Sequence, residues 1–91
     1  MGEQQLRLRE RELEWRAVEG EIVALDMSES AYLAVNESGR LLWEQLAQGT
    51  TRPALVTLLI DGYGLEPERA ERDVTAFLAA LEQRDLLVGS A

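Results

Sequence analysis

The sequence contains neither cysteine nor histidine among its 91 residues, and these two absences remove most of the familiar chemistry of a small protein. Without cysteine there is no disulfide, no thiol nucleophile and no thiolate metal site. Without histidine, the usual general base and the commonest metal ligand are missing as well. A catalytic interpretation would have to use carboxylates alone, so we expect a protein that is not an enzyme and that holds no metal and no cofactor.

Lysine is absent too, so the nine basic residues are all arginine, against 17 acidic residues, for a net charge of −8. A surface this acidic repels a phosphate backbone unless its arginines gather on one face. The sequence has no apolar run near the roughly 18 residues that a membrane span needs, and its first residues lack the apolar centre of an export signal. We therefore expect a cytoplasmic protein with neither nucleic acid nor a membrane as partner.

Alternating apolar and polar residues predict three antiparallel strands in the first part of the chain. They cover Leu13–Val18, residues 21–27 and Ala31–Val35. Glu19 and Gly20 indicate a tight hairpin between the first two strands, because glycine adopts positive φ at little cost, and residues 28–30 form the second turn. Residues 6–12 alternate in the same way but also pair charges at helical spacing, so an extra strand and a helical arm both remain open.

Three helices are expected after the strands, on the basis of their caps and apolar stripes. Asn36 caps the first, over Glu37–Gln48, whose apolar stripe includes Trp43, a side chain expected in the core. Thr51 caps the second, which Gly62 and Gly64 are expected to end. The third helix, residues 67–84, carries the clearest stripe, made of Ala70, Val74, Phe77, Leu78 and Leu81.

The element order β-β-β-α-α-α predicts one α+β domain over residues 13–91, preceded by an arm or extra strand over residues 1–12. The second and third helices are joined by a short glycine-containing turn, and the sheet beside them makes the architecture winged helix-turn-helix-like. A helix that reads DNA presents arginine, lysine, asparagine or glutamine to the bases. The exposed side of the third predicted helix is mostly acidic, so the shape permits DNA binding and the charge opposes it.

The strand Ala31–Val35 is the most informative stretch for function. An edge strand exposes a row of unpaired N–H and C=O groups, and no charged residue between Ser30 and Val35 blocks the approach of another strand. An extended peptide has room to pair there, with alternate side chains entering the space beside the third helix. The alternative is that the N-terminal arm covers the same edge.

Asp73 lies at the margin of the apolar stripe of the third predicted helix, where a charge needs a partner. An ion pair with Arg69 or Arg84, or a hydrogen bond to a loop amide, would satisfy it within the chain. Contact with a bound peptide would satisfy it from outside, and both alternatives remain open.

Four stretches, taken in order, resemble the PqqD-like family, whose members recognise precursor peptides in the biosynthesis of ribosomally made natural products. They are "EGEIVALD", "AYLAVNESGRLLWEQL", "GTTRPALVTLL" and "ERDVTAFLAALEQRDLL", and the resemblance spans residues 13–88. The length is similar to that of stand-alone members, which in lasso-peptide biosynthesis accompany a leader peptidase and a cyclase. Other members accompany radical-SAM or other tailoring enzymes.

The resemblance implies a non-catalytic role. In this family the leader region of the precursor lies as a strand against the third strand, in the cleft beside the third helix. Carried over by position, the peptide-binding residues are Ser30, Ala31, Tyr32, Leu33, Ala34, Val35, Arg69, Asp73, Val74, Phe77 and Leu81. The implied function is to bind the leader and deliver it to the leader peptidase or cyclase. The alternatives are a PqqD-like peptide chaperone for a radical-SAM or other tailoring enzyme, and an acidic winged-helix regulator that ignores leader peptides.

Overall fold

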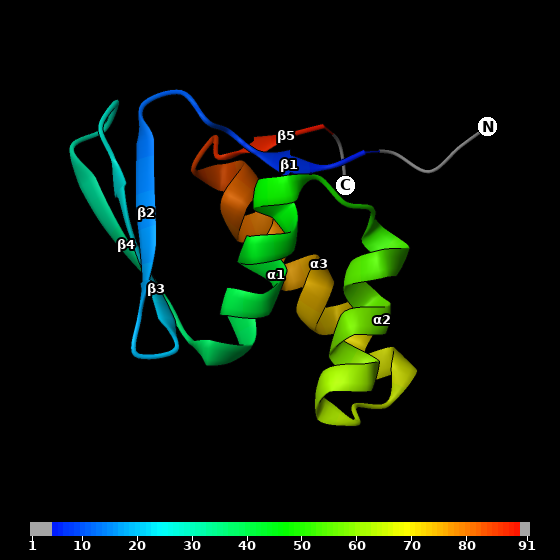
Figure 1. The fold of residues 1–91 in the computed structure, drawn as a ribbon. Helices are drawn as coiled ribbons and strands as arrows, with labels where there is room; N and C mark the ends of the chain where they lie inside the picture. Colours follow the sequence, from blue (N-terminus) through cyan, green and yellow to red (C-terminus); the bar gives the residue numbers. More distant parts are fainter. Residues whose placement is uncertain (1–4, 90–91) are drawn as a thin grey trace.

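The computed structural model describes residues 5–89, and it consists of a small sheet packed against three helices (Figure 1). Three strands form an antiparallel sheet in the order β2-β3-β4, and two shorter ones form a separate ribbon. The elements are β1 (Arg7–Leu8), β2 (Leu13–Val18), β3 (Glu21–Asp26), β4 (Ala31–Val35), α1 (Glu37–Gln48), α2 (Arg52–Tyr63), α3 (Pro67–Gln83) and β5 (Leu87–Val88). The α+β class and the three-strand, three-helix order predicted from the sequence are confirmed.

β2 and β3 are joined by the tight hairpin that the sequence predicts. Glu19 and Gly20 are the only residues between them, with φ of 53° and 83°. Positive φ at both positions is typical of a type I′ turn, whose twist matches that of the flanking strands. The resulting register places Ile22 and Ala24 on the face that the helices cover, where both are buried, and Val23 on the exposed face.

Two helices begin at their predicted caps. Asn36 Oδ1 accepts a hydrogen bond from the Gly39 N–H at 3.0 Å, and the Thr51 hydroxyl accepts one at the start of α2. The expectation that Gly62 helps to end α2 is wrong, because the helix runs through it. Gly64 alone forms the C-cap, in the left-handed conformation with φ of 65°, which glycine adopts without strain. Within residues 5–89, no helix has the length and apolar character needed to cross a membrane.

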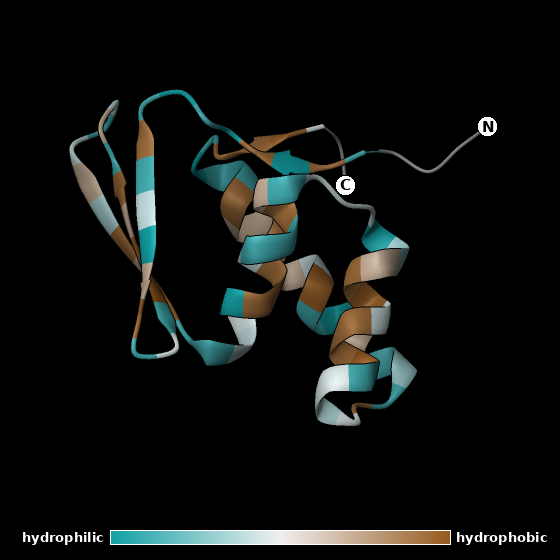
Figure 2. Ribbon diagram, viewed as in Figure 1, coloured by the Kyte–Doolittle hydropathy of each residue, from teal (hydrophilic) through white to brown (hydrophobic). Residues whose placement is uncertain are grey.

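The hydrophobic core joins all three helices to the inner face of the sheet. Figure 2 shows hydrophobic segments on the helices and on the β1–β5 ribbon where these elements meet. Trp43 on α1 is the largest fully buried side chain, as its place in the apolar stripe predicts. Trp15, on the edge strand β2, packs edge-on against it with the ring centroids 6.0 Å apart. The sheet is therefore anchored to α1 through a pair of indole rings.

The described part of the N-terminal arm, residues 5–12, contains a short strand and no helix. The expectation for residues 1–4 lies outside the described residues. β1 pairs with β5, with Leu8 opposite Leu87. Just before it, Leu6 exchanges two backbone hydrogen bonds with Thr50, at 2.7 and 2.8 Å. Leu6 and Leu8 are both buried in the core. The described part of the arm thus packs on the helices and pairs with β5, and it leaves the edge of β4 uncovered.

A polar cluster ties the arm to the sheet. Asp26 is 6% exposed, and its Oδ1 accepts hydrogen bonds from Arg9 Nη2 at 2.6 Å and from the Ser28 hydroxyl at 2.7 Å. Arg9 also donates to the backbone oxygens of Arg11 and Asp85, at 2.8 and 3.0 Å. The hydrogen bond from the Ser28 hydroxyl, supported by Arg9, lowers the pKa of Asp26 in spite of its burial. One carboxylate therefore joins the arm, the β3–β4 turn and, through Arg9, the segment after α3.

Asp26→Asn is expected to lower the melting temperature at neutral pH, because an amide forms weaker hydrogen bonds to a guanidinium than a carboxylate does. The pKa of Asp26 in the folded chain lies below its ordinary value of 3.8. The carboxylate therefore stabilises the fold fully above that pH, and this contribution is lost as the pH falls through the folded-state pKa.

Thermal unfolding followed by circular dichroism, from about pH 7 to about pH 2, measures this dependence. The gap in melting temperature between wild type and Asp26→Asn is expected to be constant at high pH and to narrow only in the acid range. Asp61→Asn, at an exposed position on α2, is the control and should show no such gap. A gap of constant size at every pH would contradict a role for the charge.

Candidate functional site

The hydrogen-bonding pattern of the sheet determines which backbone groups β4 offers. The Met27 N–H donates to the Glu12 oxygen at 2.8 Å. In the register of β2 and β3, the odd-numbered residues of β3 therefore bond with β2, and its even-numbered residues bond with β4. Tyr32 and Ala34 consequently direct their N–H and C=O groups away from β3. No loop or side chain within residues 5–89 bonds to these groups, so this edge is open to another strand.

A groove of about 240 Å³ lies between the open edge of β4 and α3. Its floor is largely apolar, and the end of β4 forms one wall. The lining residues are Leu33, Ala34, Val35, Asn36, Phe77, Ala80, Leu81 and Arg84. A chain paired with Tyr32 and Ala34 would place alternate side chains over this floor.

A larger hollow of about 670 Å³ continues the groove beyond the end of β4. Asn36 and Phe77 line both spaces, so the groove and the larger hollow adjoin each other. The larger hollow is lined by residues of α1, α2 and α3 and of the turn before α3, among them Gly39, Leu42, Leu59, Tyr63, Leu65, Arg69 and Asp73. The two together form a site that is open to solvent and mostly apolar at its base.

Phe77 separates the groove from the larger hollow. Its neighbours in the apolar stripe of α3, Val74 and Leu78, are buried in the core, whereas Phe77 is only half-buried. Its ring approaches α1 at a glycine: a Cβ built on Gly39 would lie 3.1 Å from Phe77 Cε1 and 2.5 Å from Val35 Cγ1. The absence of a side chain at Gly39 therefore makes room for the wall of the groove.

Charged residues lie towards the two ends of the site. Arg69 and Asp73 form an ion pair of 3.8 Å at the larger hollow, with side chains that are 65% and 50% exposed. Arg84 lines the smaller groove. Asp73 thus has a partner within the chain while remaining accessible to a ligand. Within residues 5–89 no group of three or more acidic side chains is placed to hold a metal ion.

Most of the residues assigned from the family resemblance line the two spaces: Leu33, Ala34, Val35, Arg69, Asp73, Phe77 and Leu81. Tyr32 offers only its backbone to this edge, because its side chain is 75% exposed and lies by the opposite face of the sheet. Ser30 lies in the turn before β4, and Ala31 pairs with Asp26 inside the sheet. Val74 lies in the core with no exposed surface for a ligand.

The structure adds residues to the site that were not assigned from the sequence. Ala80 on α3 and Arg84, the C-cap residue of that helix, follow Phe77 and Leu81 by three residues, and this spacing would have identified them. Tyr63 comes from the end of α2, and no pattern in the sequence brings it beside α1.

The chain matches the family model described as Coenzyme PQQ synthesis protein D (PqqD) over residues 21–87. Among solved structures, it is similar to TbiB1 in complex with the TbiA(beta) leader peptide, with 25% sequence identity and a TM-score of 0.85, covering 93% of this chain and 98% of that chain. It is also similar to lasso peptide synthetase B1 complexed with the leader peptide, with 25% identity and a TM-score of 0.80, covering 91% of this chain and 96% of that one. No curated protein sequence matches the chain.

Gly39→Ala is expected to destabilise the fold and to deform the groove, because the added methyl group overlaps Val35 and presses on Phe77. Overpacking of this kind costs about 1–3 kcal/mol. Gly62→Ala is the matched control, since its Cβ would meet only Leu41 Cδ1, at 3.7 Å. Alanine inside a helix is more stable than glycine by about 0.5–1 kcal/mol. Urea unfolding of both variants measures the contrast, and equal stabilisation by the two substitutions would contradict the close approach at Gly39.

Proposed function

The chain belongs to the PqqD family, and on this premise we propose that it binds the leader region of a ribosomally made precursor peptide by strand addition to β4. The observation that carries the proposal is the open edge of β4 beside a largely apolar groove. The two similar solved structures, TbiB1 and lasso peptide synthetase B1, are both complexes with a leader peptide. Their similarity covers nearly the whole chain and so supports the same role here.

In this proposal the leader is recognised through backbone hydrogen bonds and through side-chain contacts in the groove. Hydrogen bonds to the outward backbone groups of Tyr32 and Ala34 do not depend on the sequence of the peptide, so they contribute affinity but no sequence specificity. Selectivity comes from the leader side chains that enter the groove on either side of Phe77. A micromolar complex needs about 8 kcal/mol of net binding free energy. A short strand with a few buried anchors provides that much, because a small number of residues usually dominates an interface.

The bound precursor is then delivered, in this proposal, to a leader peptidase or cyclase of lasso-peptide biosynthesis. Holding the leader raises the effective concentration of the rest of the precursor at an enzyme that contacts this chain. Such a role requires no catalytic residue, which agrees with a sequence that has neither cysteine nor histidine. It places the chain in the cytoplasm, where precursor peptides are translated.

The family match favours a second candidate, a peptide chaperone for a radical-SAM or other tailoring enzyme, since its description names the synthesis of coenzyme PQQ. That match covers residues 21–87 and leaves out β1 and β2, whereas the similarity to lasso peptide synthetase B1 covers 91% of this chain. The fuller correspondence favours the lasso-type leader. The class of modifying enzyme encoded beside the gene separates these two candidates. Binding measurements with the neighbouring precursor peptide separate both from an acidic winged-helix regulator, which would bind no leader at all.

Ala34→Pro is expected to weaken leader binding by about tenfold or more, because it removes an outward N–H and adds bulk at the pairing edge. The N–H that it removes lies outside the β3–β4 ladder, so the sheet stays intact. Fluorescence polarisation with a labelled leader peptide measures the affinity. Ala17→Pro is the matched control, since its N–H points outward from the other edge strand, β2. Equal affinities for the two variants would rule out strand addition at β4.

Phe77→Ala is expected to weaken the same complex by roughly 30-fold, the effect of losing an aromatic anchor worth about 2 kcal/mol. The side chain is only half-buried, so the variant should remain folded by circular dichroism. Tyr32→Ala is the control, because it removes an exposed ring beside the opposite face of the sheet and keeps the β4 backbone. A similar loss for both rings would show that the groove does not hold the leader.

A further inference from the structure

β2 forms the other edge of the three-stranded sheet, and it also exposes unpaired backbone groups. Its even-numbered residues bond with β3, so Leu13, Trp15 and Ala17 turn their N–H and C=O groups outward. Within residues 5–89, no loop or side chain bonds to these groups. Six residues long and free of proline, β2 has the form of a strand that can template pairing with another chain.

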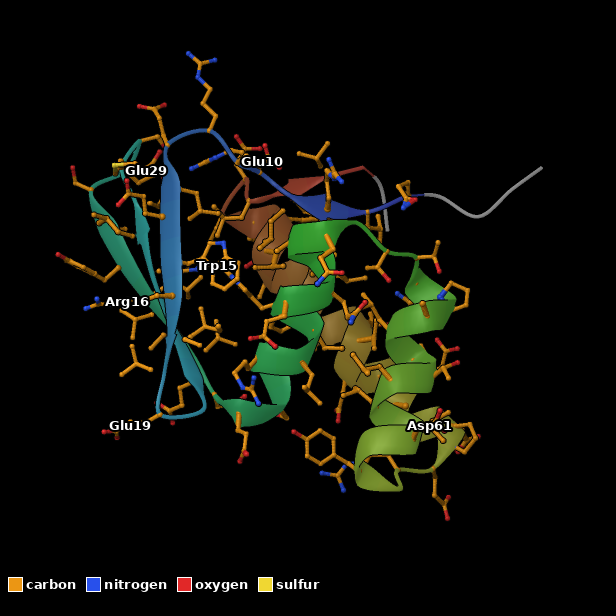
Figure 3. The ribbon with its side chains drawn as sticks, in the orientation of Figure 1. Glu10, Trp15, Arg16, Glu19, Glu29 and Asp61 are labelled. Carbon is orange, nitrogen blue, oxygen red and sulfur yellow. The ribbon has the colours of Figure 1, made fainter. Side chains whose placement is uncertain are left out.

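The charged side chains of β2 lack partners within the described chain. Glu14 and Arg16 are exposed on the outer face of the sheet, and the ion pairs found within residues 5–89 include neither of them. Across the sheet they lie opposite Leu25 and Val23, which are apolar. Figure 3 shows Arg16 pointing away from the helices and Trp15 pointing towards α1. The free edge therefore carries one negative and one positive side chain, two residues apart on one face.

We propose that this edge pairs with the same edge of a second copy of the chain, antiparallel and centred on Trp15. A two-fold axis at this point sets the two Trp15 residues opposite each other, and Leu13 of each copy opposite Ala17 of the other. These are the residues whose backbone groups point outward, so they form the hydrogen-bonded pairs. Glu14 of each copy then lies opposite Arg16 of the other, in the non-hydrogen-bonded positions, where side chains approach most closely.

Charge and sheet geometry select this register from its neighbours. A shift of one residue would bring the outer face of one copy against the inner face of the other. A shift by two residues keeps the faces together but sets Glu14 opposite Glu14, or Arg16 opposite Arg16. Like charges directly opposite each other destabilise a strand pair. Centring on Trp15 is the arrangement that pairs both charges of each copy with opposite ones.

The packing of the chain leaves room for the second copy. α1 packs over β3, one strand in from the β2 edge. Trp15 is 37% exposed in the single chain, and its counterpart would cover part of that apolar surface. The β4 edges of the two copies remain at the outer ends of the joined sheet. Pairing at β2 and peptide binding at β4 therefore do not compete for the same backbone groups.

Sedimentation velocity over a concentration series tests the proposal. The wild-type chain is expected to move from the 10.2 kDa monomer towards twice that mass as its concentration approaches about 1 mM. Glu14→Arg and Arg16→Glu each set like charges opposite each other and should shift dimerisation to at least tenfold higher concentration. An equal mixture of the two variants restores opposite charges across a heterodimer, and so does the double variant Glu14→Arg/Arg16→Glu within a homodimer.

Proline substitutions at the two edges provide an independent contrast. Ala17→Pro removes an outward N–H from β2 and should abolish the dimer, whereas Ala34→Pro, at the β4 edge, should leave it unchanged. The natural chain has no cysteine, so a Glu14→Cys chain mixed with an Arg16→Cys chain should form the interchain disulfide selectively. The expected Cα–Cα separation of about 4.5 Å in a non-hydrogen-bonded pair lies within the disulfide range.

A wild-type chain that stays monomeric at about 1 mM overturns the proposal. So does a dimer that survives both Glu14→Arg and Ala17→Pro unchanged, because it would use another surface. If the two charge variants are folded and monomeric alone but also fail to associate when mixed, the register centred on Trp15 is wrong. None of these measurements involves a leader peptide, so their failure would leave the proposed function standing.

Discussion

The two-residue turn at Glu19 and Gly20 sets the hydrogen-bonding phase of the whole sheet. With positive φ at both positions, it closes the hairpin on a hydrogen-bonded pair of Val18 and Glu21. Hydrogen-bonded and non-hydrogen-bonded pairs then alternate along the sheet. The backbone N–H and C=O groups of odd-numbered residues on β2, and of even-numbered residues on β4, therefore point away from β3. A slip of one residue would exchange the inner and outer faces and bury the wrong side chains. This one turn therefore determines which backbone N–H and C=O groups are exposed at both edges of the sheet.

The groove beside β4 exists because α3 and β4 do not pack into direct contact along their full length. Val74 and Leu78 fill the core, but Phe77 is left half-buried at its margin. Asn36 turns the chain from β4 into α1, and Gly39 in the first turn of that helix admits both Val35 and Phe77. A side chain at Gly39 would move the wall of the groove. The corner between strand and helix therefore shapes the site without itself carrying any reactive group.

The sequence was sufficient for local structure, because alternation, caps and the apolar stripe are local signals. It predicted the three strands of the sheet, the three helices and the burial of Trp43. It did not decide between a strand and a helix for residues 6–12, because β1 pairs with β5 at the opposite end of the chain. Periodicity also placed Val74 and Phe77 on one stripe. The rotation of α3 against its neighbours determines that Val74 lies in the core and that Phe77 lines the groove.

The net charge of −8 constrains any association between two copies of this chain. Long-range repulsion acts between whole molecules, whose extents are 36 × 35 × 20 Å. At physiological ionic strength the Debye length is about 8 Å, so most of that repulsion is screened. Opposite charges across a strand pair lie about 4.5–5.5 Å apart at Cβ, within the screening distance, and keep most of their attraction. Salt therefore weakens the long-range repulsion between two copies more than it weakens the attraction between Glu14 and Arg16 that selects the register.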